Sequence, residues 1–249
     1  MEDFFSFFGS VAVLPGRGGV TFGPVLGPVA DLKRGDWLSG GVVGTADAAG
    51  TADLVVRAGN KLLRLDNTGT TEAQAPVETN LDLSGASLVL NAGDFDRDGQ
   101  GDVIVRDAAG ALRLHPGNGA GSFGAGVVIS GGSFAGVAGL AVVADRNGDG
   151  QPDLVGTPAG GSAMLWPGRG RAVLGAPQGG APYVVAPEGA NLGGYDWVVP
   201  ISDGNGDGVA DLLVRQAGTG VVSLLAGSSG ALGAPRFVSA GAEVYDLAG

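Results

Sequence analysis

The sequence contains no cysteine, a single histidine and few aromatic residues, which make up 6% of the chain. The lack of cysteine excludes disulfides and thiolate metal sites, and it leaves little from which to build a catalytic pair of nucleophile and base. Only 14 residues are Lys or Arg, and they are scattered along the chain without the basic stripe that nucleic-acid binding requires. No apolar run reaches the roughly 20 residues of a membrane-spanning helix.

Glycine and acidic residues, in contrast, are abundant. The 249 residues include 50 glycines and 25 acidic residues, the formal net charge is -11, and 44% of the residues are hydrophobic. This composition is typical of a turn-rich all-β protein with small side chains that can still bury a core. We therefore expect one globular domain over residues 1–249.

Three segments repeat one pattern, with oxygen-bearing side chains at positions 1, 3, 5 and 9 and glycine at position 6. Their polar residues are Asp94, Asp96, Asp98 and Asp102; Asp145, Asn147, Asp149 and Asp153; and Asp203, Asn205, Asp207 and Asp211. We call residues 94–102, 145–153 and 203–211 the first, second and third acidic loops. Ten of the 25 acidic residues lie in them.

This spacing suits a hard divalent cation, above all calcium, because the ion removes the repulsion between carboxylates gathered in one turn. The backbone carbonyl at position 7, which belongs to Gln100, Gln151 or Val209, completes the predicted shell. We predict about three calcium ions, one in each loop. The alternative is a set of Asp and Gly turns held by hydrogen bonds from the backbone to the side chains.

The residues that follow the loops distinguish strands from helices. A helical calcium loop needs a Glu at position 12, but that position holds Val105, Gly156 and Val214. Short apolar runs follow the last Asp of each loop and soon reach glycine, which is typical of β-strands. The helical form of this site is therefore excluded.

The whole chain is periodic, with a repeat of about 50 residues. A degraded loop at Thr45–Asp53 precedes the three acidic loops, and an apolar strand running into a glycine-rich turn recurs after each loop. The predicted units are residues 1–36, 37–86, 87–136, 137–194 and 195–249. Within one unit, short apolar segments at 87–92, 103–105, 111–115 and 126–129 predict four antiparallel strands, as in a propeller blade.

The two ends of the chain predict how the first blade is completed. Glu243–Gly249 resembles the segments that precede the acidic loops, but no loop follows it. Asp3–Phe8 resembles a strand that follows a loop, and residues 11–14 and those near Val25 supply two more strands. We predict a five-bladed β-propeller of four-stranded antiparallel blades, with the first blade closed by N- and C-terminal strands, because closure pairs edges that would otherwise be exposed.

The loop pattern, the downstream Gly-x-Gly turns and segments such as Ser122-Phe123-Gly124 resemble the FG-GAP/VCBS repeat family. Similar segments are Thr21-Phe22-Gly23, Val173-Leu174-Gly175 and Ala231-Leu232-Gly233. The resemblance implies a calcium-stabilised β-propeller, as in integrin α-subunit heads, fungal and bacterial lectins and accessory domains of secreted bacterial hydrolases. The Gly- and Ala-rich composition is similar to that of VCBS arrays from actinobacteria or other high-GC bacteria. The degraded loop keeps only Asp47 and Asp53 as carboxylates, so metal binding there is left open.

Side chains at corresponding turns of different units are candidate ligand contacts. They are Trp166, His115, Arg169, Arg17 and Asn118, and sugar binding would use an aromatic face with polar neighbours. The alternative for each is turn chemistry or packing between units. Trp37, Trp197, Tyr195 and Tyr245 are expected to pack in the core. The tripeptide Arg34-Gly35-Asp36 is interpreted as a coincidence.

These features predict a non-catalytic recognition propeller that binds glycans or a cell surface. The alternatives are a protein–protein adhesion or scaffold module and a polysaccharide-active enzyme. His115 is interpreted as a bystander or a contact residue, because no Gly-x-Ser-x-Gly motif accompanies it. We expect neither nucleic acid nor membrane insertion. We expect an extracellular or cell-surface location because of the family and because such loops need about 0.1 to 1 mM calcium. This expectation does not rest on a targeting signal, since no signal peptide is recognisable at the start of the chain.

Overall fold

The computed structural model describes residues 2–7, 10–15, 26–31, 37–42, 54–66, 75–130, 133–146, 148–170, 183–184, 191–201, 203–228, 231–242 and 245–248. The strands before residue 55, the pair at 183–184 and the last strand are described by their backbone pairing. Arg17, the degraded loop at 45–53, the tripeptide at 34–36 and the segments at 21–23 and 173–175 lie outside the described residues.

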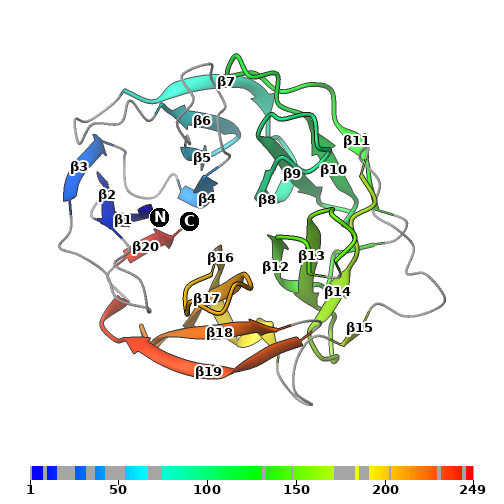
Figure 1. Cartoon of the computed structure of the whole chain (residues 1–249). Helices are drawn as coiled ribbons and strands as arrows, with labels where there is room; N and C mark the ends of the chain where they lie inside the picture. Colours follow the sequence, from blue (N-terminus) through cyan, green and yellow to red (C-terminus); the bar gives the residue numbers. More distant parts are fainter. Residues whose placement is uncertain are drawn as a thin grey trace.

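The described residues form twenty strands in five four-stranded antiparallel sheets (Figure 1). The first sheet has the order β20-β1-β2-β3, with β1 (Glu2–Phe7), β2 (Ser10–Pro15), β3 (Leu26–Asp31) and β20 (Tyr245–Ala248). The second contains β4 (Trp37–Val42), β5 (Leu54–Ala58), β6 (Lys61–Leu65) and β7 (Val77–Asp82). The third contains β8 (Ala86–Gly93), β9 (Asp102–Asp107), β10 (Leu112–His115) and β11 (Val127–Val128).

The fourth and fifth sheets follow the same order along the chain. They consist of β12 (Ala138–Val143), β13 (Asp153–Thr157), β14 (Met164–Trp166) and β15 (Tyr183–Val184), and of β16 (Tyr195–Ile201), β17 (Asp211–Gln216), β18 (Val222–Ser228) and β19 (Ala231–Ser239). One 3₁₀ turn, η1 (Leu192–Gly194), precedes β16. Among the described residues no helix has the length and apolar character needed to cross a membrane.

The sheets are arranged around a common centre (Figure 1). One strand of each sheet lies nearest that centre, namely β4, β8, β12, β16 and β20, and contacts join these strands in the cyclic order β4, β8, β12, β16, β20 and back to β4. The two chain termini meet there, because β1 pairs with β20 through the registers Phe5 to Ala248 and Ser6 to Leu247. An all-β chain of four-stranded antiparallel sheets is thereby confirmed.

The strands of the third sheet match the predicted segments to within two residues. The strand β9 is longer than predicted at both ends, because Asp102, the ninth position of the first acidic loop, pairs with Gly93, and Asp107 pairs with Ala86. The strand β11 is shorter, although Ile129 beyond its end still donates its N–H to the carbonyl of Leu112 at 2.9 Å. The apolar runs therefore located the strands, and the hydrogen bonds decided where each one ends.

The core lies between neighbouring sheets. One cluster joins Ile104 and Leu114 of the third sheet to Leu140 and Leu154 of the fourth. A second joins the fourth sheet to the fifth, and a third joins the second sheet to the third. Each strand that follows an acidic loop is buried on both faces, which explains its continuous apolar run.

The apolar residue before the glycine of the Phe-Gly motif packs into the hydrophobic core next to the preceding sheet. Phe123 is 5% exposed and belongs to the cluster that contains Val55 and Leu62 of the second sheet. The side chain of Asn80 fixes it there, accepting from the Phe123 N–H and donating to its carbonyl, both at 2.8 Å. Leu232 has the corresponding place between the fifth and fourth sheets.

Polar side chains near the far end of β9, β13 and β17 tie each sheet to the segment that leads into the next. Arg106 donates through Nη1 to the carbonyls of Phe134 and Val137 at 3.0 and 2.8 Å. Thr157 accepts the N–H of Leu192, and Arg215 donates to the carbonyl of Ala242. Arg215 also stacks over Trp197, which is 6% exposed, so the core position expected for this tryptophan is confirmed.

Of the other aromatic residues expected in the core, Tyr195 is half-buried and packs against the cluster between the fourth and fifth sheets. The side chains of Trp37 and Tyr245 lie outside the described part, so their placement stays a prediction.

We expect Phe123→Ala to lower the free energy of unfolding by about 3 to 5 kcal/mol, because it empties a filled hole between two sheets. Phe237→Ala is the matched control, since Phe237 lies on β19 and is 68% exposed. Chemical denaturation of both variants measures the difference. Similar stability for the two variants would contradict the role of Phe123 in joining the sheets.

Candidate metal centre

The three acidic loops occupy equivalent places in successive sheets. They connect β8 to β9, β12 to β13, and β16 to β17, so each one joins the strand nearest the centre to the second strand of its sheet (Figure 1). All three therefore project from the same end of their sheets. Their shared position is a direct consequence of the repeat seen in the sequence.

The Asp at position 9 is buried in every acidic loop. Asp102 and Asp153 are 0% exposed and Asp211 is 1% exposed. One carboxylate oxygen accepts backbone N–H groups from the start of the same loop: Oδ2 of Asp102 accepts from Phe95 at 2.9 Å and from Asp96 at 3.2 Å. Equivalent bonds reach Oδ2 of Asp153 and Oδ2 of Asp211. This side chain therefore closes the loop on itself.

The other oxygen of the same carboxylate reaches a glycine at or just after the end of the third strand of its sheet. The N–H groups of Gly117, Gly168 and Gly227 donate to Asp102, Asp153 and Asp211 at 2.9, 2.9 and 2.6 Å. A Cβ atom on these glycines would lie about 2 Å from the carbonyl oxygen of the residue before each Asp, so only glycine fits. We call this pairing of a buried Asp with a glycine N–H the Asp–Gly latch.

Burial opposes the charge of the latch carboxylates. It raises the pKa of Asp102 and of Asp153 to about 6, against the lowering effect of the backbone N–H donors. Burial also raises the pKa of Asp96, and the neighbouring charge of Asp98 adds to that rise. A cation next to these groups would favour their charged forms.

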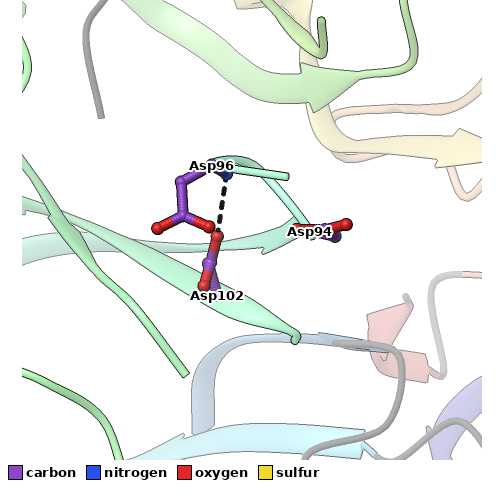
Figure 2. A group of neighbouring side chains, drawn as sticks. All are labelled: Asp94, Asp96 and Asp102. Atoms are coloured by element: carbon purple, nitrogen blue, oxygen red, sulfur yellow. Dashed lines mark hydrogen bonds between the residues drawn. The ribbon is translucent and has the colours of Figure 1, made fainter. Parts of the chain in front are cut away.

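The first acidic loop brings three carboxylates together. Oxygen atoms of Asp94, Asp96 and Asp102 all lie within 4.8 Å of one another, and this is the one such group among the described residues. Figure 2 shows the hydrogen bond from the Asp96 N–H to Asp102, with Asp94 beside them. The Oδ1 atom of Asp94 is buried and has no hydrogen-bond partner among the described residues. A buried carboxylate oxygen without a donor is costly unless a cation approaches it.

The second and third loops hold the Asp at position 1 differently. Oδ1 of Asp145 accepts from the N–H groups of Gly148 and Asp149, and its Oδ2 accepts from Gly150. Asp203 accepts the same three bonds within its own loop, and the N–H of Gly208 lowers the pKa of Asp203. These two loops therefore adopt the hydrogen-bonded turn that was the alternative to a metal site, whereas the first loop groups its carboxylates.

The residues at positions 3, 5 and 7 line the loops. The carboxylates at position 5, which are Asp98, Asp149 and Asp207, each accept the N–H of the residue two positions later. The side chains of Gln100 and Gln151 lie against Gly119 and Gly170 of the following turns, and Oε1 of Gln151 is buried without a partner in the described part. Asn205 accepts the N–H of Asp207, Val209 is half-buried, and Asn147 lies outside the described residues.

These donors fit a hard divalent cation. Every polar side chain predicted as a ligand offers oxygen, and glycines at position 6 adopt positive φ values of 92°, 85° and 86° at Gly99, Gly150 and Gly208. In the first loop, the buried Oδ1 of Asp94 is an oxygen ligand that accepts no hydrogen bond from any group in the described residues. Nitrogen and sulfur ligands of transition metals are absent from the predicted ligand set.

Two features of the loops were not anticipated. Position 4 also adopts a positive φ, at Gly148, Gly206 and the non-glycine Arg97, where φ is 66°. Arginines also link neighbouring loops: Nη2 of Arg97 donates to the carbonyl of Gly150, and Nη1 of Arg146 donates to the carbonyl of Ala210, both at 2.6 Å. The recurrence of glycine at position 4 was a usable signal for the first feature, while contacts between loops leave no local pattern.

The candidate ligand contacts in the turns have structural partners. Trp166 packs against Phe134, with ring centroids 5.1 Å apart, and Nδ1 of His115 lies 3.2 Å from the carbonyl of Gly124. Burial lowers the pKa of His115. Oδ1 of Asn118 accepts from Ala120 and Ser122 within its turn, and the residue Arg169 is exposed. Their role in binding stays a prediction.

Comparison with protein families identifies one repeat. Residues 94–156 match the FG-GAP-like repeat, which confirms the resemblance to FG-GAP repeats for this segment. The match begins at the first acidic loop and includes the second. No curated protein matches the sequence.

Solved structures of two lectins share the fold. A lectin of Agrocybe aegerita that recognises non-reducing terminal N-acetylglucosamine is 20% identical, with a TM-score of 0.52 over 93% of this chain and 61% of that chain. The lectin BP39L from Burkholderia pseudomallei is 18% identical, with a TM-score of 0.50 over 95% of this chain and 69% of that chain. This chain thus spans less than two thirds of the Agrocybe lectin. At these identities the likeness concerns the fold and not the ligand.

The latch predicts that two aspartates of one loop differ in their effect on the metal-free protein. In excess chelator, Asp102→Ala should lower the free energy of unfolding by about 2 to 3 kcal/mol, because three backbone N–H groups lose their acceptor. Asp98 of the same loop is exposed, so Asp98→Ala should change the free energy of unfolding by less than about 0.5 kcal/mol. Denaturation in chelator measures both, and equal effects would refute the latch.

Proposed function

We propose that this chain is a non-catalytic, calcium-stabilised recognition β-propeller that binds glycans. Its five sheets would be five blades, and the first blade would be completed by strands from both ends of the chain. The proposal has three parts, namely the closed ring, the calcium sites and the glycan-binding face.

The ring is supported by the pairing of β1 with β20 and by the cyclic contacts among the strands nearest the centre. A ring closed in this way leaves no inner strand edge free for association with another chain. Because the clusters of the core lie between adjacent sheets, each blade depends on its neighbours for burial. Closure therefore stabilises the first and last blades together.

The observation that carries the calcium proposal is the group formed by Asp94, Asp96 and Asp102, with the buried and unpartnered Oδ1 of Asp94. The ligands in the first loop would be Asp94, Asp96, Asp98, the carbonyl of Gln100 and Asp102. The corresponding residues would hold ions in the second and third loops after their position 1 carboxylates exchange backbone donors for the ion. A bound calcium ion would supply the positive charge that buried carboxylates otherwise lack.

Glycan recognition is supported by the fold shared with two lectins and by the placement of candidate contacts at successive turns. Four of the candidate contacts lie just before or within the Gly-x-Gly turns of the third and fourth sheets, namely Trp166, His115, Asn118 and Arg169. Trp166 is half-buried, so part of its ring is available to stack on a sugar while the rest packs in the core. Arg169 is an exposed residue, and its guanidinium would donate hydrogen bonds to sugar hydroxyls.

A non-catalytic role is supported by the setting of the chain's single histidine. His115 is half-buried, and burial holds its pKa below the usual value. The acidic-loop carboxylates that could act as an acid–base pair are better explained as metal ligands, and backbone N–H groups donate to two of them, Asp145 and Asp203. An extracellular or cell-surface location fits this proposal, because calcium loops of modest affinity fill at the about 0.1 to 1 mM calcium found outside cells.

Calcium binding is tested by removing the metal. We expect excess chelator to lower the melting temperature, and Asp98→Ala to reduce the number of bound ions by one from about three, as counted by native mass spectrometry. Glu78→Ala, an exposed carboxylate outside the loops, should bind as many ions as the wild type. An unchanged melting temperature in chelator would argue strongly against metal-stabilised loops.

Glycan binding is tested on an array of immobilised sugars in the presence of calcium. We expect binding that Trp166→Ala and Arg169→Ala each weaken by about tenfold or more, in line with the loss of a stacking or charged contact. Phe237→Ala controls for the removal of an aromatic residue elsewhere, and circular dichroism verifies that the variants are folded. An array without any bound sugar would refute the glycan proposal and favour a protein partner. Release of products from polysaccharides would instead favour an enzyme.

A further inference from the structure

Arg146 belongs to the second acidic loop but lies at the base of the third. Arg146 is 8% exposed, and its Nη1 donates to the carbonyl of Ala210 at 2.6 Å. A Cβ atom on Gly227 would lie 2.2 Å from the same Nη1, so the guanidinium lies against the glycine of the third Asp–Gly latch. Gly227 itself donates to Oδ1 of Asp211. The arginine therefore contacts the backbone on both sides of that latch, at Ala210 and at Gly227.

The charge of Arg146 is thus placed near candidate ligands of the third loop. Burial lowers the pKa of Arg146, and the carboxylates of Asp211, Asp153 and Asp207 act in the opposite direction. Asp211 and Asp207 are positions 9 and 5 of the third loop. A fixed positive charge next to them offsets part of their mutual repulsion without any metal.

The second loop shares part of this charge, because Arg146 also interacts with Asp153 at position 9 of that loop. Arg97 reaches the second loop, but it is exposed and binds the carbonyl of Gly150 at the rim. The sequence of the degraded loop, Thr45–Asp53, contains no Lys or Arg. The first loop is also the one whose carboxylates gather within 4.8 Å. Of the two described arginines that contact a neighbouring acidic loop, the buried one therefore lies at the third loop.

We propose that Arg146 is a built-in countercharge that makes the third acidic loop the weakest of the three calcium sites and the one least dependent on calcium for its fold. This inference rests on the proposed calcium binding. A divalent ion entering the third loop meets a positive charge already present, whereas an ion entering the first loop meets the grouped carboxylates of Asp94, Asp96 and Asp102. The calcium sites of this chain are therefore filled in order, with the first loop before the third.

The role of Arg146 is tested in the full chain with the first and second sites removed by Asp98→Asn and Asp149→Asn. Isothermal titration with calcium then reports the third loop alone. We expect Arg146→Gln to tighten calcium binding roughly three- to tenfold, the size of one screened charge interaction. The same variant should melt at a lower temperature in chelator, because the countercharge is lost.

Two controls separate charge from packing. Arg236→Gln makes the same change in net charge at an exposed position of β19 and should leave the affinity unchanged. Arg146→Lys keeps the charge while altering the hydrogen bond and should bind calcium nearly as the parent does. An Arg146→Gln affinity equal to or weaker than that of Arg236→Gln would overturn the proposal.

A second measurement does not alter Arg146. Three variants, each retaining one intact acidic loop, are titrated with calcium, and the loop 94–102 should bind most tightly and the loop 203–211 most weakly. The reverse order would overturn the inference even if calcium binding itself holds. If the wild-type chain binds no calcium at all, the proposed function fails first, and the two failures are therefore distinguishable.

Discussion

The structure depends on a buried aspartate carboxylate in each acidic loop, which accepts hydrogen bonds from two separate parts of its sheet. In each acidic loop the Asp at position 9 accepts N–H groups from the start of its own loop and from a glycine in the next turn of the sheet. The chain is rich in glycine, whose backbone can adopt many conformations, so the local sequence alone would not fix the conformation of these loops and turns. Three repeated latches hold each loop in the place where its other carboxylates can meet a cation.

The latch also explains how one repeat serves both fold and site. Burial makes ionised Asp102 and Asp153 unfavourable, which their raised pKa values reflect, and backbone donors offset only part of that cost. Bound calcium would offset much of the remainder, so ion binding and folding would be coupled in the same residues. The inter-sheet contacts of Phe123, Arg106 and Arg215 are independent of the ion and set the arrangement on which the loops stand.

Much of the fold and the location of the site could be predicted from the sequence, because both are written as local periodic patterns. The run from Val103 to Val105 located β9, and the spacing from Asp94 to Asp102 located the loop. The different state of Asp145 could not be predicted, since its spacing equals that of Asp94 and only three-dimensional hydrogen bonding separates them. Arg146 was equally hidden, because its partner Ala210 is 64 residues away.

The most direct test of this account is a crystal structure of the chain grown in millimolar calcium, with anomalous scattering used to locate the ions. The account predicts an ion in the first acidic loop, bound by Asp94, Asp96 and Asp102, while Asp102 keeps its hydrogen bond to the Gly117 N–H. A first loop without anomalous signal, or an ion whose binding breaks the Asp–Gly latch, would contradict it.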